Sequence, residues 1–295
     1  LATYFREFLR GHMKTWINDD NNRKPDGSKY NLNTDGLKIY TTINYSMQEM
    51  AENAVTSHMP RLQKEFFEQN ETLDDSIAPF RELTSGAVDT LLRVSMRRSE
   101  RWRKMKYDLK KNDEEIEESF YIPKEMTVFS WAGEIDTTMT PLDSMKYYKS
   151  FFRPGMMSMD PTNGYIKAWV GGMNYRHFQY DMVKKGKRQI GSTFKPFVYA
   201  AAIDQLKLSP CDTFPDSQFC IEKNKFGNVE QWCPKNSGDK YGRTRTLKNA
   251  LANSVNTITA RLIDRIGPRT VVKLAKDLGI EQRILPVPSI ALGTP

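Results

Sequence analysis

Proline at position 196 constrains the fold of this chain more than any other single residue. It follows Lys195 in the segment RQIGSTFKPFVYAAAID, whose apolar run 197–203 is typical of a buried helix. A proline in a helix interior costs about 3 kcal/mol, but the first turn tolerates it because the first N–H groups have no intrahelical partner. The helix is therefore predicted to begin near Ser192, with Gly191 allowing the chain to turn sharply into it.

This start places Ser192 and Lys195 three residues apart, so their side chains share one helix face. A serine hydroxyl becomes a good nucleophile only when a base takes its proton, and a lysine can do so once desolvation makes it neutral. Phe194 and Phe197 supply an apolar wall for that amine. The helix N-terminus would also stabilise negative charge on a bound carbonyl oxygen. The pattern predicts a nucleophile and its base.

A serine and a lysine at this spacing are not sufficient by themselves. Ser237 and Lys240 have the same S-x-x-K spacing, but they lie in the polar turn PKNSGDKYG, where nothing holds both side chains on one face. The alternative for Ser192 is an ordinary N-cap serine followed by a solvated lysine one turn later. The spacing alone leaves both interpretations open.

A second polar pair favours the catalytic interpretation. Ser254-Val255-Asn256 is the only S-x-N sequence of the chain, and it interrupts the apolar helical stretch ALANSVNTITA. Buried serine and asparagine side chains lower stability unless hydrogen-bond partners satisfy them. A serine hydroxyl can relay a proton to a leaving amine, and an asparagine amide can hold a peptide bond of a substrate. The alternative is a buried polar pair with a structural role only.

The first half of the chain predicts mixed helices and strands. Alternating side chains at 34–43 predict a strand, and the helix that follows is expected to be capped by Ser46. The face of that helix is predicted to hold Met47, Met50, Ala51 and Ala54. Residues 59–118 are charged and mostly helical in period, and residues 125–141 return to strand-like sequence.

The second half predicts a hairpin and then helices. Asn163-Gly164 indicates a tight turn within residues 155–172, because this pair accommodates a positive φ. Near the end of the chain a helix is predicted from Pro268, closed by Gly279. Its apolar stripe is predicted to consist of Val271, Leu274, Ala275 and Leu278.

The three cysteines lie close together in the sequence, at positions 211, 220 and 233. None has a metal-ligand partner nearby, because the three histidines are far away in the sequence. An oxidising compartment would allow one bridge, for which Cys220 with Cys233 is the expected pair. Three reduced thiols are the alternative.

Four segments together resemble, in order and spacing, the transpeptidase domain of class A penicillin-binding proteins: MDPTNGYIKAWVGG, RQIGSTFKPFVYAAAID, WCPKNSGDKYGRTRTLKNALANSVNTITARLIDRIG and SIALGTP. The resemblance covers residues 155–295. It is weaker in the first half, where GLKIYTTINYSMQEMAENAV is similar to the segment that joins the glycosyltransferase and transpeptidase domains.

The resemblance implies a division of the chain and a fold. Residues 1–152 would be the joining region, a smaller mixed α/β domain, and residues 153–295 the N-terminal part of the transpeptidase domain. The expected fold class is α+β, with helices packed on an antiparallel sheet. It would be an incomplete version of the fold that penicillin-binding transpeptidases share with serine β-lactamases.

The resemblance also implies acyl transfer on cell-wall stem peptides that end in D-Ala-D-Ala. Ser192 would attack the penultimate carbonyl with Lys195 as general base, and D-alanine would leave. Ser254 would pass a proton to the departing amine, and Asn256 would position the substrate. The amine of a neighbouring stem would then take the acyl group, whereas β-lactams would acylate Ser192 and stay bound. No metal and no other cofactor is implied.

The chain is expected to be a piece of a longer, bifunctional wall synthase. It begins with Leu1 and has no signal-peptide pattern and no apolar run of about 18 residues. The glycosyltransferase domain and the membrane anchor of the family would lie outside it. The expected location is the outer, periplasmic face of the bacterial cytoplasmic membrane, and expected partners include proteins of the cell-wall machinery.

One motif of the family is absent from the sequence. No K-T-G or K-S-G occurs, although in the family this element lines the site, contacts the substrate carboxylate and contributes to the oxyanion hole. Ile190 also stands where the family often has proline. Oxyanion donors contribute several kcal/mol of transition-state stabilisation, so the chain alone is expected to be inactive or a poor catalyst.

Other functions remain as alternatives. A β-lactamase or a penicillin sensor uses the same serine and lysine, but the joining segment argues against both. A non-catalytic interaction module would dock partners of the wall machinery through the first half of the chain. Nucleic-acid binding is disfavoured despite the formal net charge of +8, because acidic residues follow the basic run Met96–Lys111 directly. No zinc-knuckle or RNP-like pattern accompanies that run, which is typical of a solvated helical face.

Overall fold

The computed structural model describes residues 1–70, 80 and 83–294, and the chain divides into two compact units, Leu1–Gly186 (unit 1) and Lys187–Pro295 (unit 2). Helices and short antiparallel strand pairs make up both units, which confirms the α+β fold class. The domain boundary expected between residues 152 and 153 rests on sequence motifs and stays a prediction. The two compact units meet at a different place, between Gly186 and Lys187. No described helix combines the length and the apolar character that a bilayer span requires.

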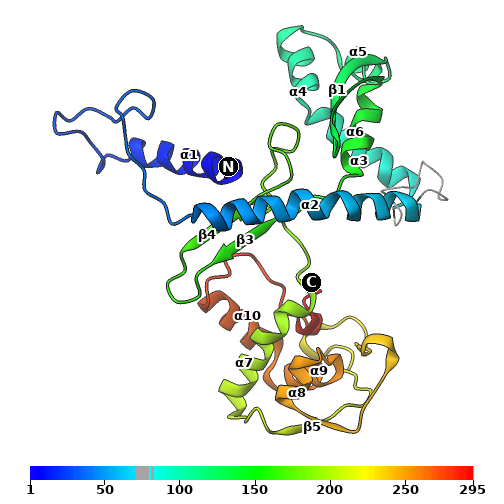
Figure 1. The fold of residues 1–295 in the computed structure, drawn as a ribbon. Helices are drawn as coiled ribbons and strands as arrows, with labels where there is room; N and C mark the ends of the chain where they lie inside the picture. Colours follow the sequence, from blue (N-terminus) through cyan, green and yellow to red (C-terminus); the bar gives the residue numbers. More distant parts are fainter. Residues whose placement is uncertain (71–79, 81–82, 295) are drawn as a thin grey trace. The chain divides into compact units, whose positions relative to one another are not determined.

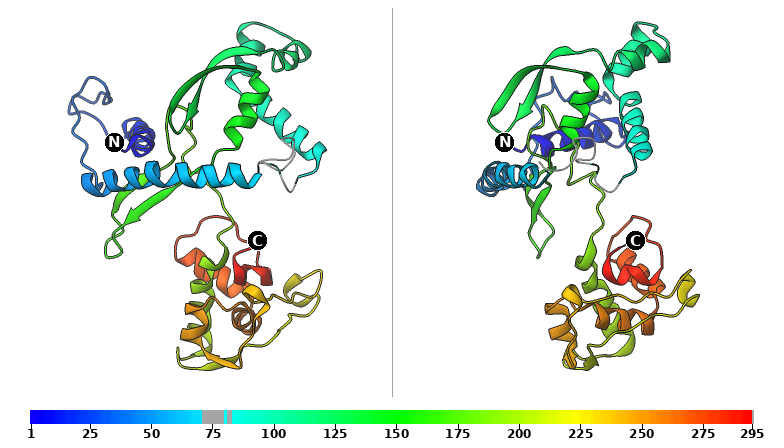
Figure 2. Two further views of the ribbon diagram at one scale, coloured as in Figure 1. Left: turned by 45° about the vertical axis from the view of Figure 1, so that its right-hand side comes forward. Right: turned by 90° about the vertical axis from the view of Figure 1, so that its right-hand side faces the viewer.

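Unit 1 contains helices and two strand pairs (Figure 1, Figure 2). Its helices are α1 (Thr3–Asn18), α2 (Tyr45–Asn70), α3 (Ser85–Arg97), α4 (Glu100–Arg103), η1 (Lys104–Asp108), α5 (Asp113–Glu118) and α6 (Pro141–Lys149). The antiparallel pairs are β1 (Lys124–Ser130) with β2 (Gly133–Met139), and β3 (Met156–Met159) with β4 (Ile166–Val170). Both pairs confirm the strands predicted at 125–141 and 155–172, and Gly164 has the positive φ, 74°, that its turn requires.

Helix α2 confirms the helix predicted after residue 45, but its cap and its buried face differ from the prediction. Asn44 rather than Ser46 caps it, since Asn44 Oδ1 accepts a hydrogen bond from Met47 N at 3.0 Å. The helix runs along the β3–β4 pair (Figure 1), where Ala51, Val55 and Met59 pack on Ala168 and Val170. This packing direction turns Met50 (62% exposed) and Ala54 to solvent.

Residues 34–43 form no strand in the described structure, so that prediction was wrong. The segment is irregular, and Tyr40 is largely exposed. It reaches β4 only near its end, where Thr42 Oγ1 donates to Ile166 O at 2.8 Å and Asn44 N donates to Lys167 O at 2.9 Å. Alternating side chains predicted the strand, but a strand also needs a partner edge along its length.

The charged stretch 59–118 is mostly helical, as predicted, although its residues 71–79 and 81–82 lie outside the described residues. The basic run 96–111 covers the end of α3, α4 and η1, and most of its arginine and lysine side chains are exposed. Beneath it, Trp102 packs with Met96 and Phe120 in a small apolar cluster. The run is therefore a solvated helical face.

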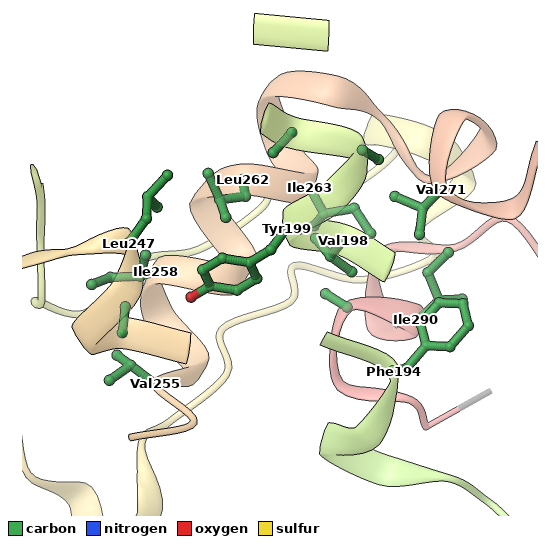
Figure 3. Close-up of a cluster of buried hydrophobic side chains, with 14 of the residues drawn as sticks. Phe194, Val198, Tyr199, Leu247, Val255, Ile258, Leu262, Ile263, Val271 and Ile290 are labelled. Atoms are coloured by element: carbon green, nitrogen blue, oxygen red, sulfur yellow. The ribbon is translucent and has the colours of Figure 1, made fainter. Parts of the chain in front are cut away.

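Unit 2 packs its helices around one apolar core. Its elements are η2 (Gly191–Phe194), α7 (Lys195–Leu206), β5 (Thr213–Pro215), η3 (Lys225–Gly227), η4 (Ser237–Asp239), β6 (Thr244–Thr246), α8 (Leu247–Ala252), α9 (Asn256–Ile266), α10 (Pro268–Asp277) and η5 (Pro288–Leu292). Figure 3 shows Val198 and Tyr199 of α7 among core side chains from α8, α9, α10 and η5. Strands β5 and β6 pair with each other.

Helix α10 confirms the helix predicted from Pro268, and Gly279 closes it with φ 95°. Val271 and Ala275 are fully buried, and Leu274 packs against the same core. Leu278 is 63% exposed instead of buried. The reason is that the helix ends at Asp277, so the next residue no longer continues the apolar stripe.

The predicted bridge between Cys220 and Cys233 is present, and Cys211 is an exposed free thiol. Within the closed loop, Ile221 and Trp232 exchange two backbone hydrogen bonds of 2.9 Å. The bridge therefore fixes the path of the chain just before it turns towards α9.

Removal of this bridge is expected to destabilise unit 2. The cysteines are 13 residues apart, and a loop of this size corresponds to about 3 kcal/mol of unfolded-state entropy. We expect the double substitution Cys220→Ser, Cys233→Ser to lower the free energy of unfolding by about 3 kcal/mol, measured by hydrogen exchange of the α9 amides. Cys211→Ser is the control and should change it by less than about 0.5 kcal/mol. An equal loss in the control would contradict the pairing.

Candidate active site

Pro196 lies in the first turn of α7, as predicted, but the α-helix begins at Lys195 and not near Ser192, which lies in the 3₁₀ turn before it. Gly191 has φ 58°, and the 3₁₀ turn η2 leads into α7 with Pro196 in the first helical turn. Phe194 and Phe197 stack with their ring centroids 5.1 Å apart, and both pack in the apolar core of unit 2. The predicted apolar wall is therefore present at the start of this helix.

The Lys195 side chain is buried, with 1% of the residue exposed, and its amine donates three hydrogen bonds. The acceptors are Ser254 O at 2.6 Å, Ser254 Oγ at 3.0 Å and Asn256 Oδ1 at 2.5 Å. Three of the four predicted site residues thus meet, although Lys195 and Ser254 are 59 positions apart in the chain. The alternative of a freely solvated lysine does not hold.

Ser254 contacts the Lys195 amine with both its carbonyl oxygen and its hydroxyl because it lies in the break between helices α8 and α9. Helix α8 ends at Ala252, α9 begins at Asn256, and Ser254 has φ 52°. Such a left-handed conformation costs a non-glycine residue about 1–3 kcal/mol. The sequence predicted one helical stretch interrupted by polar residues, whereas the structure has two helices with the serine in the gap between them.

Burial disfavours the charged form of the Lys195 amine and lowers the pKa of Lys195 to about 8. Its three acceptors suit an ammonium group, which has three N–H donors, whereas a neutral amine has two donors and one lone pair. After losing a proton, the amine can therefore accept from the Ser254 hydroxyl across the same 3.0 Å contact. The site holds a lysine and a serine that are placed to exchange a proton.

Ser192 is exposed and lies in the 3₁₀ turn that precedes the buried Lys195. No hydrogen bond joins Ser192 Oγ to Lys195 Nζ within the described residues, so the structure does not place the two groups in direct contact. In a 3₁₀ turn, however, residues three apart lie one above the other, and Ser192 stands one such turn before Lys195. Catalytic hydrogen bonds often tighten only when substrate binds, and the role of Ser192 as nucleophile stays a prediction.

Asn256 is held by two neighbours that the sequence reasoning missed. Asn256 Nδ2 donates to Lys235 O at 2.7 Å, and Asn256 N donates to Asn236 Oδ1 at 3.0 Å. Because Nδ2 is engaged by a carbonyl group, Oδ1 is the end of the amide that faces Lys195. Lys235 and Asn236 lie in a polar turn, and no sequence spacing connects them to Asn256.

Gly293 was also missed, and it supports the turn before Ser192. Gly191 N donates to Gly293 O at 3.1 Å, and Gly293 has φ 68°. A Cβ on Gly293 would lie 2.0 Å from Gly191 O, far inside van der Waals contact. Glycine is therefore required at 293 for its backbone conformation and for this close approach. The glycine of the segment SIALGTP was the only available signal.

The second S-x-x-K sequence does not form such a site. Ser237 and Lys240 are both exposed, and the two residues between them, Gly238 and Asp239, have φ of 67° and 54°. These left-handed residues prevent a common helical face, as the polar turn predicted.

The titration of Lys195 can be measured directly. We expect the Cε signal of Lys195, in the NMR spectrum of the lysine-labelled chain, to titrate with a midpoint near pH 8, the amine being charged below and neutral above. The substitution Lys195→Arg should remove this signal and thereby assign it. A midpoint at about pH 10.4, the value of a free lysine, would contradict burial as the dominant effect.

Gly293→Ala is expected to distort the turn that carries Ser192. The added Cβ collides with Gly191 O, and the left-handed backbone adds strain, so we expect a destabilisation of about 2–4 kcal/mol. Gly279→Ala is the matched control, since Gly279 also has a positive φ but nothing lies within 4 Å of its added Cβ. Thermal unfolding and the amide shifts of Gly191 and Ser192 report the difference. Equal effects of both substitutions would refute the importance of the close approach.

Two protein-family descriptions match the chain. Residues 75–152 match the penicillin-binding protein middle domain, and residues 155–287 match the penicillin binding protein transpeptidase domain. All four predicted site residues lie within the second match: Ser192, Lys195, Ser254 and Asn256. The middle domain was not predicted from the sequence, in which this stretch shows charge and helical period up to residue 118 and strand-like residues at 125–141.

Two curated relatives align with about half of the chain. Penicillin-binding protein 1A of Aquifex aeolicus (strain VF5) is 35% identical over 141 residues, which are 47% of this chain and 19% of that protein. Penicillin-binding protein 1A of Neisseria lactamica is 34% identical over 140 residues, 47% of this chain and 17% of that protein. The aligned part therefore spans less than a fifth of the length of these relatives.

The fold is similar to that of a solved structure. Penicillin-Binding Protein 1A from Haemophilus influenzae matches with a TM-score of 0.58 and 21% sequence identity, over 99% of this chain and 43% of that chain. At this level of identity the likeness concerns the fold alone. The family matches of residues 75–152 and 155–287 lead to one conclusion: the chain belongs to the penicillin-binding proteins, and residues 155–287 are part of a transpeptidase domain.

Proposed function

We propose that this chain is part of the transpeptidase of a bifunctional cell-wall synthase. The enzyme would be a serine acyltransferase that cross-links stem peptides ending in D-Ala-D-Ala and is acylated by β-lactams. The observation that carries the proposal is the buried amine of Lys195, which contacts Ser254 and Asn256 one turn after Ser192. The transpeptidase match of residues 155–287 supports the same reaction class.

In the first step, the Ser192 oxygen attacks the penultimate carbonyl carbon while neutral Lys195 takes the hydroxyl proton. A pKa of about 8 for Lys195 leaves a useful fraction of the amine neutral near pH 7. The tetrahedral intermediate collapses when the bond to the nitrogen of the terminal D-alanine breaks. That nitrogen gains its proton from Lys195 Nζ through Ser254 Oγ, which lies 3.0 Å from the amine. An ester between Ser192 and the stem peptide remains.

In the second step, the proton moves back along the same path. The amine of a neighbouring stem attacks the ester carbonyl and loses a proton to Ser254 and Lys195. The Ser192 oxygen leaves and regains a proton, and a new peptide bond joins the two stems. A β-lactam would acylate Ser192 by ring opening and would keep its own nitrogen attached, so the ester would persist.

Asn256 would hold the substrate next to the base. One hydrogen of Asn256 Nδ2 goes to Lys235 O, and Asn256 Oδ1 accepts from Lys195. The second Nδ2 hydrogen is left to donate to a carbonyl group of the substrate backbone. The same amide would thereby connect the bound peptide to the lysine.

The rest of the proposed enzyme lies outside these residues. The sequence has no K-T-G, so an important part of the oxyanion hole and of the carboxylate contact is missing, and we expect the chain alone to be inactive or weakly active. The relatives are much longer than the aligned part. We propose that a glycosyltransferase domain and a membrane anchor belong to the same polypeptide and place it at the periplasmic face of the membrane, among other proteins of the wall machinery.

A penicillin should acylate Ser192 in the full-length protein. Mass spectrometry should find one adduct, on the peptide that contains Ser192, and its rate of formation should fall about tenfold per pH unit below pH 8 as Lys195 becomes protonated. Ser192→Ala should abolish the adduct. Ser237→Ala, the matched substitution in the second S-x-x-K sequence, should leave it unchanged.

Two results would defeat the proposal: an adduct on Ser237, or no adduct at all in the full-length protein. Fast release of the adduct would favour a β-lactamase instead of a synthase. A role as a non-catalytic docking module would be supported if the Ser192→Ala protein retained full function in cells together with its binding to wall-synthesis proteins.

A further inference from the structure

Asp216 is a buried carboxylate that the proposed reaction does not use. It directly follows β5, and none of its surface is exposed. A buried charge lowers stability unless hydrogen bonds and an opposite charge compensate it. The hydrogen-bond partners of Asp216 therefore indicate its role.

Four donors surround the Asp216 carboxylate. Oδ1 accepts from Asn236 Nδ2 at 2.7 Å and Thr257 Oγ1 at 2.9 Å, and Oδ2 accepts from Arg245 Nε at 2.7 Å and Gly242 N at 3.0 Å. Burial raises the pKa of Asp216, but the hydrogen bonds outweigh this effect and hold the pKa below its ordinary value. The charged carboxylate thus joins β6, the loop before it and the first turn of α9.

Asn236 is oriented by Asp216. Asn236 Nδ2 donates to Asp216 Oδ1 and to Lys240 O at 3.0 Å, so Asn236 Oδ1 points the other way. There it accepts from Asn256 N at 3.0 Å and Thr257 N at 3.2 Å. These are N–H groups of the first turn of α9, whose own N-cap residue provides no side-chain hydrogen bond. Asn236 therefore caps α9 from a different segment of the chain.

This cap holds the residue that faces the Lys195 amine. Asn256 is the first residue of α9, and its side chain links Lys235 O to Lys195 Nζ. Lys235 is the neighbour of Asn236, so both contacts of Asn256 with this segment depend on the same short stretch. Without it, the Asn256 amide could rotate and present Nδ2, a donor, to an amine that is itself a donor.

We propose that Asp216 and Asn236 are positioning residues of the transpeptidase site. Asp216 orients Asn236, and Asn236 holds Asn256 so that its carbonyl oxygen faces Lys195. Neither residue has a hydrogen bond to Lys195 or Ser192 among the described residues, so both act through Asn256. The inference rests on the proposed function, in which Asn256 and Lys195 take part.

A double-mutant cycle tests the inference in the full-length protein, with the rate constant for acylation of Ser192 by a fluorescent penicillin as the readout. Asn236→Ala should slow acylation by about tenfold or more. In an Asn256→Ala background the same substitution should slow acylation by less than about twofold, because the Asn256 side chain through which Asn236 acts is already absent. Equal factors in the two backgrounds would indicate a merely structural role and overturn the inference.

Matched variants separate positioning from stability and from the proposed function. Ile258→Val removes one methylene from a fully buried position of α9 without touching the hydrogen bonds, and it should change the rate by less than about twofold. If Asn236→Ala does not fold, Asn236→Ser replaces it in the cycle, because the short serine side chain cannot reach both Asp216 and α9. The rates in the two backgrounds are then compared in the same way. If the wild type is acylated and the Asn236 variant is acylated at the same rate, this inference is overturned but the proposed function is not. Absence of Ser192 acylation in the wild type overturns the proposed function.

Discussion

The buried amine of Lys195 is the interaction on which the candidate site depends. An ammonium group removed from water must find other acceptors, and three oxygen atoms of residues 254 and 256 provide them. The apolar core around α7 lowers the pKa of this amine, and the gap between α8 and α9 makes the oxygen atoms accessible to it. Acyl transfer requires an amine that is readily deprotonated and can act as a base, beside a hydroxyl that can relay the proton.

Residues with left-handed backbone conformations lie both before α7 and before α9, and hydrogen bonds to distant segments of unit 2 support them. Gly191, Ser254 and Gly293 all have positive φ. Such residues persist in a folded protein where surrounding contacts determine their conformation. On the α7 side, the hydrogen bond from Gly191 to Gly293 provides this support. On the α9 side, the hydrogen bonds that begin at Asp216 keep the first turn of the helix in place.

The sequence predicted those features of the site that have a local cause. Proline fixes its own backbone, so the place of Pro196 in the first turn of a helix could be predicted, and the polar pair at 254 and 256 stood out in an apolar stretch. The supporting contacts join residues that are 20 or more positions apart, such as Asn236 with Asn256, and no periodicity reveals them. The same limit explains the wrong strand at 34–43, because alternation cannot say whether a partner edge exists.

The bridge between Cys220 and Cys233 has a consequence for how this protein matures. Three cysteines allow three different bridges, and two of these include Cys211, which lies at the surface. The native pair encloses the hydrogen-bonded residues Ile221 and Trp232 and precedes the segment that contacts α9. In an oxidising compartment, a wrong first bridge would have to be exchanged before the helix could be capped. The exchange needs a thiolate that attacks the wrong bridge, a step that takes seconds to hours and is therefore slow compared with helix formation.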